Sequence, residues 1–186
     1  AFETLEQSLP YKHLIKAVGL DSSEKGNPPS KFQKVFEVSI KEGYVPVAHA
    51  GEEGPAEYIW EALDLLKIAR IDHGNNCLTD EVLVKRLVDD KIALTVCPLS
   101  NLELKVVDDL KDHPLKKMLN LGLKATVNSD DPAYFGGYMN ANFLQTAEAL
   151  DLTKEDVKTL VKNSFEYSLL SDDEKQKYLI QVENFE

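Results

Sequence analysis

The sequence predicts an α/β fold built on a parallel sheet, and three observations support this. Short apolar, β-prone stretches alternate with segments whose apolar residues recur at helical spacing. The stretch at residues 92–96 is apolar except for Thr95, as in strands buried on both faces of a parallel sheet. Polar side chains follow the expected strands, and in parallel sheets functional residues gather at these carboxyl ends. Because parallel strands need crossover connections, usually helices, we expect one α/β domain over residues 1–186.

The first half of the chain alternates between expected helices and strands. Residues 1–11 have apolar side chains at helical spacing and are closed by Pro10, so a helix is expected to end there. Ser30 with Gln33 has the spacing of a capping box, which predicts a helix up to residue 43. Pro55 is expected to open the next helix. The strands expected in this half cover residues 14–20, 44–47 and 69–72.

The same alternation continues in the second half. Thr79 is expected to cap a helix whose Val82, Leu83 and Leu87 face the core. Strands are expected over residues 92–96 and 123–127, with a short helix over residues 114–121 between them. Beyond residue 138 the pattern is helical. We expect helices over residues 142–150, from Thr153 with Asp156 to residue 167, and from Ser171 with Glu174 onward.

Composition narrows the classes of function. A formal net charge of −11 argues against the phosphate-neutralising surface of a nucleic-acid binder. The sequence has no run of ~18 apolar residues for a membrane span and no signal-peptide pattern at its start, so a cytoplasmic location is expected. Cys77 and Cys97 lack the spacing of a thiolate zinc site and are expected to be free thiols. The expected partner is a small molecule.

The strongest candidate for chemistry is the segment from His49 to Glu52. It follows the strand expected at residues 44–47, and Ala50 and Gly51 leave room for both side chains to enter one pocket. A proton transfer or a metal site needs such a pair. The alternative is that His49 is a hydrogen-bonded core histidine and that Glu52 favours the start of a helix, where a carboxylate suits the dipole.

Two later strand ends carry similar side chains, namely His73 and the pair Asp130 and Asp131. Imidazole and carboxylate groups are ligands for zinc, which lowers the pKa of bound water to about 7. The pooling of histidines and carboxylates therefore predicts a metal-assisted hydrolytic site. The alternatives are a core or supporting histidine at His73 and a capped turn at Asp130 to Pro132.

Four motifs in order resemble those of the adenosine and adenine deaminases, zinc-dependent aminohydrolases on a (β/α)8 barrel: HAGE at residues 49–52, IDHG at 71–74, CPLSN at 97–101 and NSDDP at 128–132. Three further stretches resemble the subgroup that acts on free adenine. These are GLDSSE at residues 19–24, EEGP with EYIW at 52–60 and DPAYFGGY at 131–138. The resemblance implies deamination of adenine to hypoxanthine and ammonia, in purine salvage.

The resemblance also implies roles for individual residues. His49 and Asp130 would be zinc ligands, and Glu52 would donate a proton to N1 of the purine. His73 would orient the hydroxide that attacks C6. The substrate contacts would come from Asp131, which would hydrogen-bond N7, and from a main-chain N–H near Ser22, which would meet N3.

One departure from the family pattern concerns the paired ligands of its first strand. A His-x-His motif is absent from residues 1–186, where the other histidines are His13 and His113. The chain resembles strands four to eight of the barrel, and a complete barrel takes ~250 residues. We therefore expect the carboxyl-terminal part of a deaminase, with further ligands on an N-terminal segment. Open sheet edges predict a homo-oligomer or pairing with the N-terminal half.

Two other functions stay open at this point. One is a related enzyme that uses the same ligands, such as an adenosine or N6-substituted adenine deaminase, or another barrel aminohydrolase or phosphodiesterase. The other is a non-catalytic half-barrel that binds a purine or a partner chain. The missing pair of histidines favours this second alternative, whereas the four ordered motifs favour the enzyme.

Overall fold

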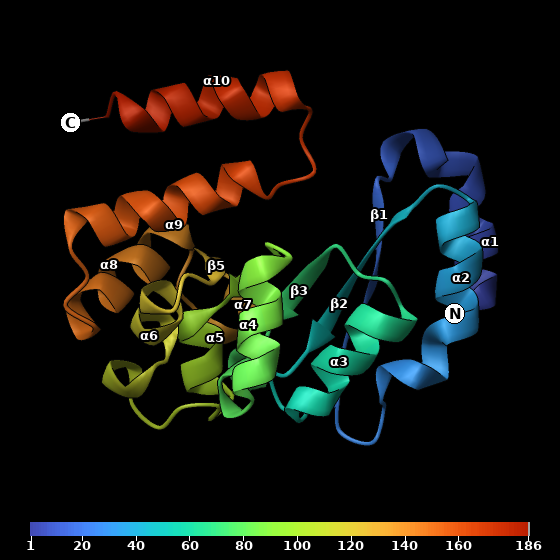
Figure 1. Ribbon diagram of the computed structural model, residues 1–186, viewed down its shortest axis with the longest axis horizontal. Helices are drawn as coiled ribbons and strands as arrows, with labels where there is room; N and C mark the ends of the chain where they lie inside the picture. Colours follow the sequence, from blue (N-terminus) through green and yellow to red (C-terminus); the bar gives the residue numbers. More distant parts are fainter. Residues whose placement is uncertain (186) are drawn as a thin grey trace. The chain divides into compact units, whose positions relative to one another are not determined.

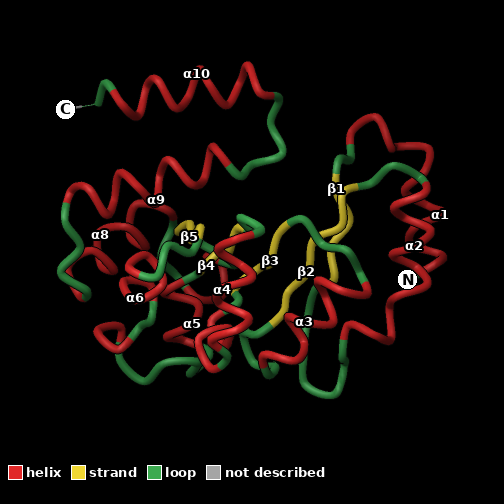
Figure 2. The backbone as a smooth tube through the Cα atoms, in the orientation of Figure 1, coloured by secondary structure: helices red, strands yellow, loops and turns green. Residues whose placement is uncertain are grey.

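The computed structural model describes residues 1–185, and the chain divides into two compact units, Ala1–Lys85 and Arg86–Glu186. Figure 2 shows strands alternating with helices along the chain. Strands pair in parallel within each unit, as the α/β prediction requires. None of the helices in the described residues combines the length and the apolar character needed to cross a membrane.

In the first unit, β2 lies between β1 and β3. The register pairs Leu20 with Ala48 and Ala50 with His73, so the ends of all three strands lie at one edge. Helices α2 and α3 pack against β2, and α1 lies beside α2 (Figure 1). The elements are α1 (Phe2–Ser8), a 3-10 helix (Leu9–Leu14), β1 (Ala17–Leu20), a 3-10 helix (Pro29–Phe32), α2 (Gln33–Lys41), β2 (Val45–Ala50), α3 (Ala56–Leu65), β3 (Arg70–His73) and a 3-10 helix (Asn75–Thr79).

Three predicted boundaries in this unit are corrected. The first strand is shorter than predicted, because Leu14 is exposed and belongs to a 3-10 helix. Strand β2 runs to Ala50, so His49 lies within the strand and not after it, because pairing with β3 continues to that point. Ser30 makes no side-chain cap; it lies in a 3-10 turn, and its N–H donates to Glu61 Oε2 at 2.9 Å.

The cap of α4 (Glu81–Asp89) is Asp80 and not Thr79 as predicted. The Asp80 carboxylate accepts from Val82 N at 2.9 Å and from Leu83 N at 3.1 Å, whereas the Thr79 hydroxyl donates back to Asn76 O. Leu83 and Leu87 are buried, as predicted. Val82 was also expected to face the core, but its side chain is 68% exposed. Trp60 Nε1 also donates to Asp80, and these bonds lower the pKa of its carboxyl group.

In the second unit, β4 pairs in parallel with β5, and α9 packs on β5. Helix α10 lies along α9 (Figure 1), where the Phe165 and Tyr178 rings stack at 4.7 Å. The elements after α4 are β4 (Ala93–Val96), α5 (Pro98–Glu103), a 3-10 helix (Leu110–Asp112), α6 (Leu115–Asn120), β5 (Lys124–Val127), α7 (Pro132–Phe135), α8 (Met139–Ala149), α9 (Lys154–Glu166) and α10 (Asp172–Glu183).

Both capping boxes predicted in this unit are confirmed. Thr153 and Asp156 bond each other's main-chain N–H groups at the start of α9, and Ser171 and Glu174 do the same at α10. Lys116 Nζ also donates to Asp156 at 2.7 Å, and this bond with the cap bonds lowers the pKa of Asp156 to about 2. Helices α5 and α7 were not predicted, although each begins with a proline at its first position.

The buried side chain of His113 should make the stability of this unit depend on pH. Its ring is buried, with Nδ1 accepting from Leu115 N at 3.2 Å and Nε2 lying 3.2 Å from Asn101 Oδ1. Burial lowers its pKa from 6.5 to about 4. The unfolded chain therefore binds the proton first as pH falls, so the stability present above pH 6.5 is lost toward pH 4.

Between pH 7 and pH 5 this group should lower the free energy of unfolding by about 2 kcal/mol. Urea unfolding at the two pH values measures the difference. His113→Gln should flatten it, while His13→Gln, at an exposed position, should leave it unchanged. An equal pH dependence in the wild-type protein and the His113 variant would contradict the assignment.

Candidate active site

Two histidines meet where β2 and β3 end. The register places His49 beside Asp72 and Ala50 beside His73, so the imidazoles come from neighbouring strands one step apart. Their ring centroids lie 4.9 Å apart in an edge-to-face arrangement. His73 has φ +66°, a left-handed conformation that is rare for a residue with a side chain. Such local strain occurs most often at functional sites.

Glu52 joins this pair from the loop after β2. Its Oε1 lies 3.2 Å from His73 Nδ1, and the two side chains are 10% and 2% exposed. The potential ligand atoms of His49, Glu52 and His73 all lie within 4.8 Å of one another. Two imidazoles and a carboxylate at this spacing are donors that suit a borderline divalent cation such as zinc. The arrangement therefore fits either a metal site or a carboxyl group held for proton transfer.

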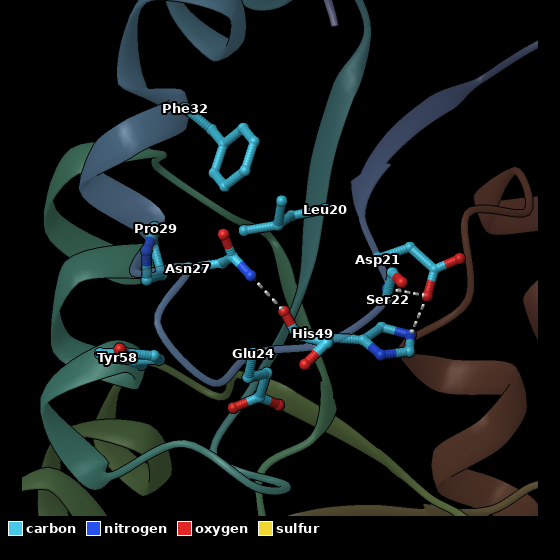
Figure 3. A pocket seen from close by; sticks show the side chains of 10 residues that line it. Leu20, Asp21, Ser22, Glu24, Asn27, Pro29, Phe32, His49 and Tyr58 are labelled. Carbon is cyan, nitrogen blue, oxygen red and sulfur yellow. Dashed lines mark hydrogen bonds and ion pairs between the residues drawn. The ribbon is translucent and has the colours of Figure 1, made fainter.

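The loop after β1 forms one wall beside His49. Asp21 Oδ1 lies 3.4 Å from His49 Nε2, and the Asp21 side chain is 80% exposed. Ser22 has φ +76°, and its main-chain N–H donates to the Asp21 carboxylate. A cavity of about 240 Å³ opens here, with Phe32 and Tyr58 on its far side (Figure 3). The cavity is thus lined by His49 of the cluster, by Ser22 and by the aromatic side chains of Phe32 and Tyr58.

The predicted residues Asp130 and Asp131 belong to the second unit. Two residues separate them from the end of β5, and Asp130 has φ +55°, which turns the chain sharply there. Asp131 begins α7 with its main-chain carbonyl, but its side chain makes no cap hydrogen bond. The alternative reading of Asp130 to Pro132 was a turn capped by a side chain. The structure has a turn there, but the Asp131 side chain does not cap it. The meeting of these carboxylates with His49 stays a prediction.

Asp21 and Asn76 were not predicted as site residues from the sequence. Asp21 is the first residue after β1, and Asn76 follows the His73-Gly74 strand end, so both stand at positions where functional residues of parallel sheets gather. Glu24 entered the sequence analysis only as the last residue of the GLDSSE stretch at residues 19–24, and not as a residue that bonds the loop carrying Glu52. The position of these residues just after strands could have marked them in the sequence. Their hydrogen-bond partners could not be predicted, because they depend on how the loops fold.

Comparison with known proteins matches residues 2–185 to the adenosine deaminase family. An adenine deaminase of Acinetobacter baylyi is 59% identical over 182 residues, which cover 98% of this chain and 55% of that protein. An adenine deaminase of Caulobacter vibrioides is 60% identical over 185 residues, with 54% of its length covered. The chain thus spans about half the length of these curated relatives.

Two solved structures are similar to the chain. The crystal structure of an adenine deaminase from Arthrobacter aurescens has a TM-score of 0.95 at 50% identity, over 97% of this chain and 55% of that one. A Burkholderia ambifaria amidohydrolase with bound Zn has a TM-score of 0.81 at 28% identity, over 89% of this chain and 46% of that one. These likenesses and the parallel strand–helix order confirm the prediction of part of a (β/α)8 barrel. The chain belongs to the adenosine deaminase family.

Proposed function

We propose that the complete protein hydrolyses adenine to hypoxanthine and ammonia and that it uses one zinc ion. The observation that carries this proposal is the convergence of Glu52, His73 and His49 at one edge of the sheet. The high identity to proteins named adenine deaminase supports adenine as the substrate. We also propose that the reaction serves purine salvage in the cytoplasm. The chain is proposed to assemble as a homo-oligomer or with an N-terminal half of the barrel.

The proposed metal ligands in this chain are His49 and Asp130. When bound, zinc would lower the pKa of a water molecule so that hydroxide is available near neutral pH. The donor set around His49 fits such an ion, because Glu52 and His73 place further nitrogen and oxygen atoms within 4.8 Å. The Zn-bound amidohydrolase with a similar structure supports the choice of metal.

Glu52 is proposed to protonate N1 of the purine, and His73 to orient the attacking oxygen at C6. Their 3.2 Å contact fixes the carboxyl group against an imidazole that is itself almost fully buried. A proton donor held in a buried position contributes typically 10²–10⁴-fold to rate. Protonation of N1 draws electrons from C6, so attack there and departure of the amino group as ammonia become easier.

Asp131 is proposed to hydrogen-bond N7, and the Ser22 main-chain N–H to donate to N3. In the structure that N–H donates to Asp21, so binding of the purine requires the Asp21 carboxylate to release it. The exposed Asp21 side chain has room to rotate away. Release would also end its contact with His49 Nε2 and free that nitrogen for the proposed metal.

Steady-state assays of the complete protein test the substrate assignment. Adenine, adenosine and an N6-substituted adenine are compared by kcat/KM, with ammonia release as the readout. We expect adenine to exceed adenosine by at least about 100-fold, since a site fitted to the free base excludes a ribose. Removal of metal by a chelator should abolish activity, and added zinc should restore it. Preference for the nucleoside, or activity that survives chelation, would contradict the proposal.

A further inference from the structure

We infer that Glu24 is a positioning residue for Glu52 and acts together with Asn76: the two side chains bind opposite polar groups of the loop at residues 51–54. Glu24 comes from the loop after β1 and Asn76 from the turn after β3, while Glu52 lies on the loop after β2. The inference rests on the proposed function, because it concerns the group assigned there as proton donor.

The Glu24 carboxylate binds the N–H groups of this loop. Oε2 accepts from Gly51 N at 2.9 Å and from Gly54 N at 2.8 Å, and Oε1 accepts from Glu52 N at 3.0 Å. Glu24 is only 6% exposed. A buried carboxylate is stable only when its oxygens are well hydrogen-bonded, and bonds to an ionised acceptor are about twice as strong as neutral ones. Glu24 therefore holds the main chain of the loop firmly.

Asn76 binds the carbonyl groups of the same loop. Its main-chain N–H donates to Gly51 O at 2.8 Å, and its side-chain amide donates to Gly54 O at 2.8 Å and to Glu52 O at 3.3 Å. The N–H of Glu52 is thus bound by Glu24 and its carbonyl by Asn76. With its main chain held on both sides, Glu52 places its carboxyl group through side-chain torsions alone, against His73.

The glycines of the loop are fitted to this arrangement. A Cβ atom on Gly54 would lie 2.5 Å from Glu24 Oε2 and 2.6 Å from the Tyr58 ring. A side chain at this position would therefore push the carboxylate off the N–H groups that it binds. The neighbouring carboxylate of Glu53 behaves differently, because it pairs with Lys25 at 3.2 Å on the surface, where such pairs contribute little. Glu53 is therefore a matched control on the same loop.

The test replaces Glu24 by glutamine in the complete protein and compares it with Glu53→Gln. One acceptor oxygen becomes an NH₂ donor that faces main-chain N–H groups, so the loop should shift. We expect kcat for adenine to fall about 10–100-fold with little change in KM, as for a misplaced catalytic group. The pH profile of kcat should shift as well, and Glu24→Asp should recover part of the loss. Glu53→Gln should match the wild-type protein in all three readouts.

A double-mutant cycle separates this inference from the proposed function. If Glu24 acts through Glu52, then Glu24→Gln should cause almost no further loss of activity in a Glu52→Gln background. Losses that multiply, or a Glu24→Gln enzyme as active as the Glu53 control, would overturn the inference. Should Glu24→Gln fail to fold, Asn76→Ala tests the inference in its place. We expect this variant to lower kcat and to cause almost no further loss in the Glu52→Gln background. Full activity of Glu52→Gln alone would instead refute the proposed function.

Discussion

Glu52→Gln in the complete protein is expected to lower kcat for adenine about 10³-fold, within the range of a general acid. Glutamine keeps the size of the side chain and one oxygen for the contact with His73 Nδ1, but it has no acidic proton to give to N1. The loop that carries residue 52 is bound through its main chain, so the substitution should leave its path unchanged. KM should therefore change much less than kcat.

Zinc content decides between the two roles that the geometry allows for Glu52. A proton donor can be replaced without loss of metal, whereas replacing a ligand typically releases it. We expect the variant to retain zinc, measured by atomic emission after dialysis beside the Glu53→Gln control. Near-normal turnover would end the proton-donor assignment. Loss of zinc together with activity would show that Glu52 binds the metal through the cluster with His49 and His73.

Gly51→Ala is expected to lower the free energy of unfolding by about 2–5 kcal/mol, the largest stability effect proposed for this chain. Gly51 has φ +77°, where a residue with a Cβ atom is strained by about 1–2 kcal/mol. Its Cβ would also lie 2.5 Å from Ile59 Cδ1 and 2.9 Å from Cγ1. Ile59 is fully buried on α3, so relieving this overlap should add about 1–3 kcal/mol.

Gly26→Ala separates the two contributions. Gly26 has φ +72°, but a Cβ there would have no atom within 4 Å, so only the backbone strain applies. Urea unfolding of the wild-type protein and both variants measures the difference, which should show Gly51→Ala as clearly the less stable variant. Equal losses of stability would mean that α3 shifts easily and that the contact with Ile59 has little effect.

The sequence predicted the fold class and the positions of the histidines well, for a physical reason. A strand buried in a parallel sheet needs a continuous apolar run, and the polar residue that ends the run marks the functional edge. His49 lies near the end of β2 for this reason. Strand β3 is no such run, because Arg70 and Asp72 alternate with Ile71 before His73. The exact ends of strands were less predictable, because they depend on the neighbour: β2 continues to Ala50 opposite His73 of β3.

Interactions between distant segments could not be predicted. Thr79 and Asp80 are both good helix caps, and the path of the chain after β3 selects Asp80. Likewise, Glu24 bonds Gly51 and Gly54 across more than two dozen residues, and no local pattern marks these partners. The capping box of Thr153 and Asp156 was predicted correctly because both groups lie in one local turn. Ser30 has the same spacing to Gln33, but it lies in a 3-10 turn and makes no side-chain cap.

The parallel pairing of the first unit has a consequence for how the chain is made. Strand β1 pairs with β2 and β2 pairs with β3, so each strand meets the next one along the chain. The pairs β1–β2 and β2–β3 need nothing synthesised after His73. Chains emerge from the ribosome at about 5–20 residues per second, so the strands that follow His73 become available only later. The strand pairs that bring His49 and His73 to one edge can thus form while translation of the later strands is still under way.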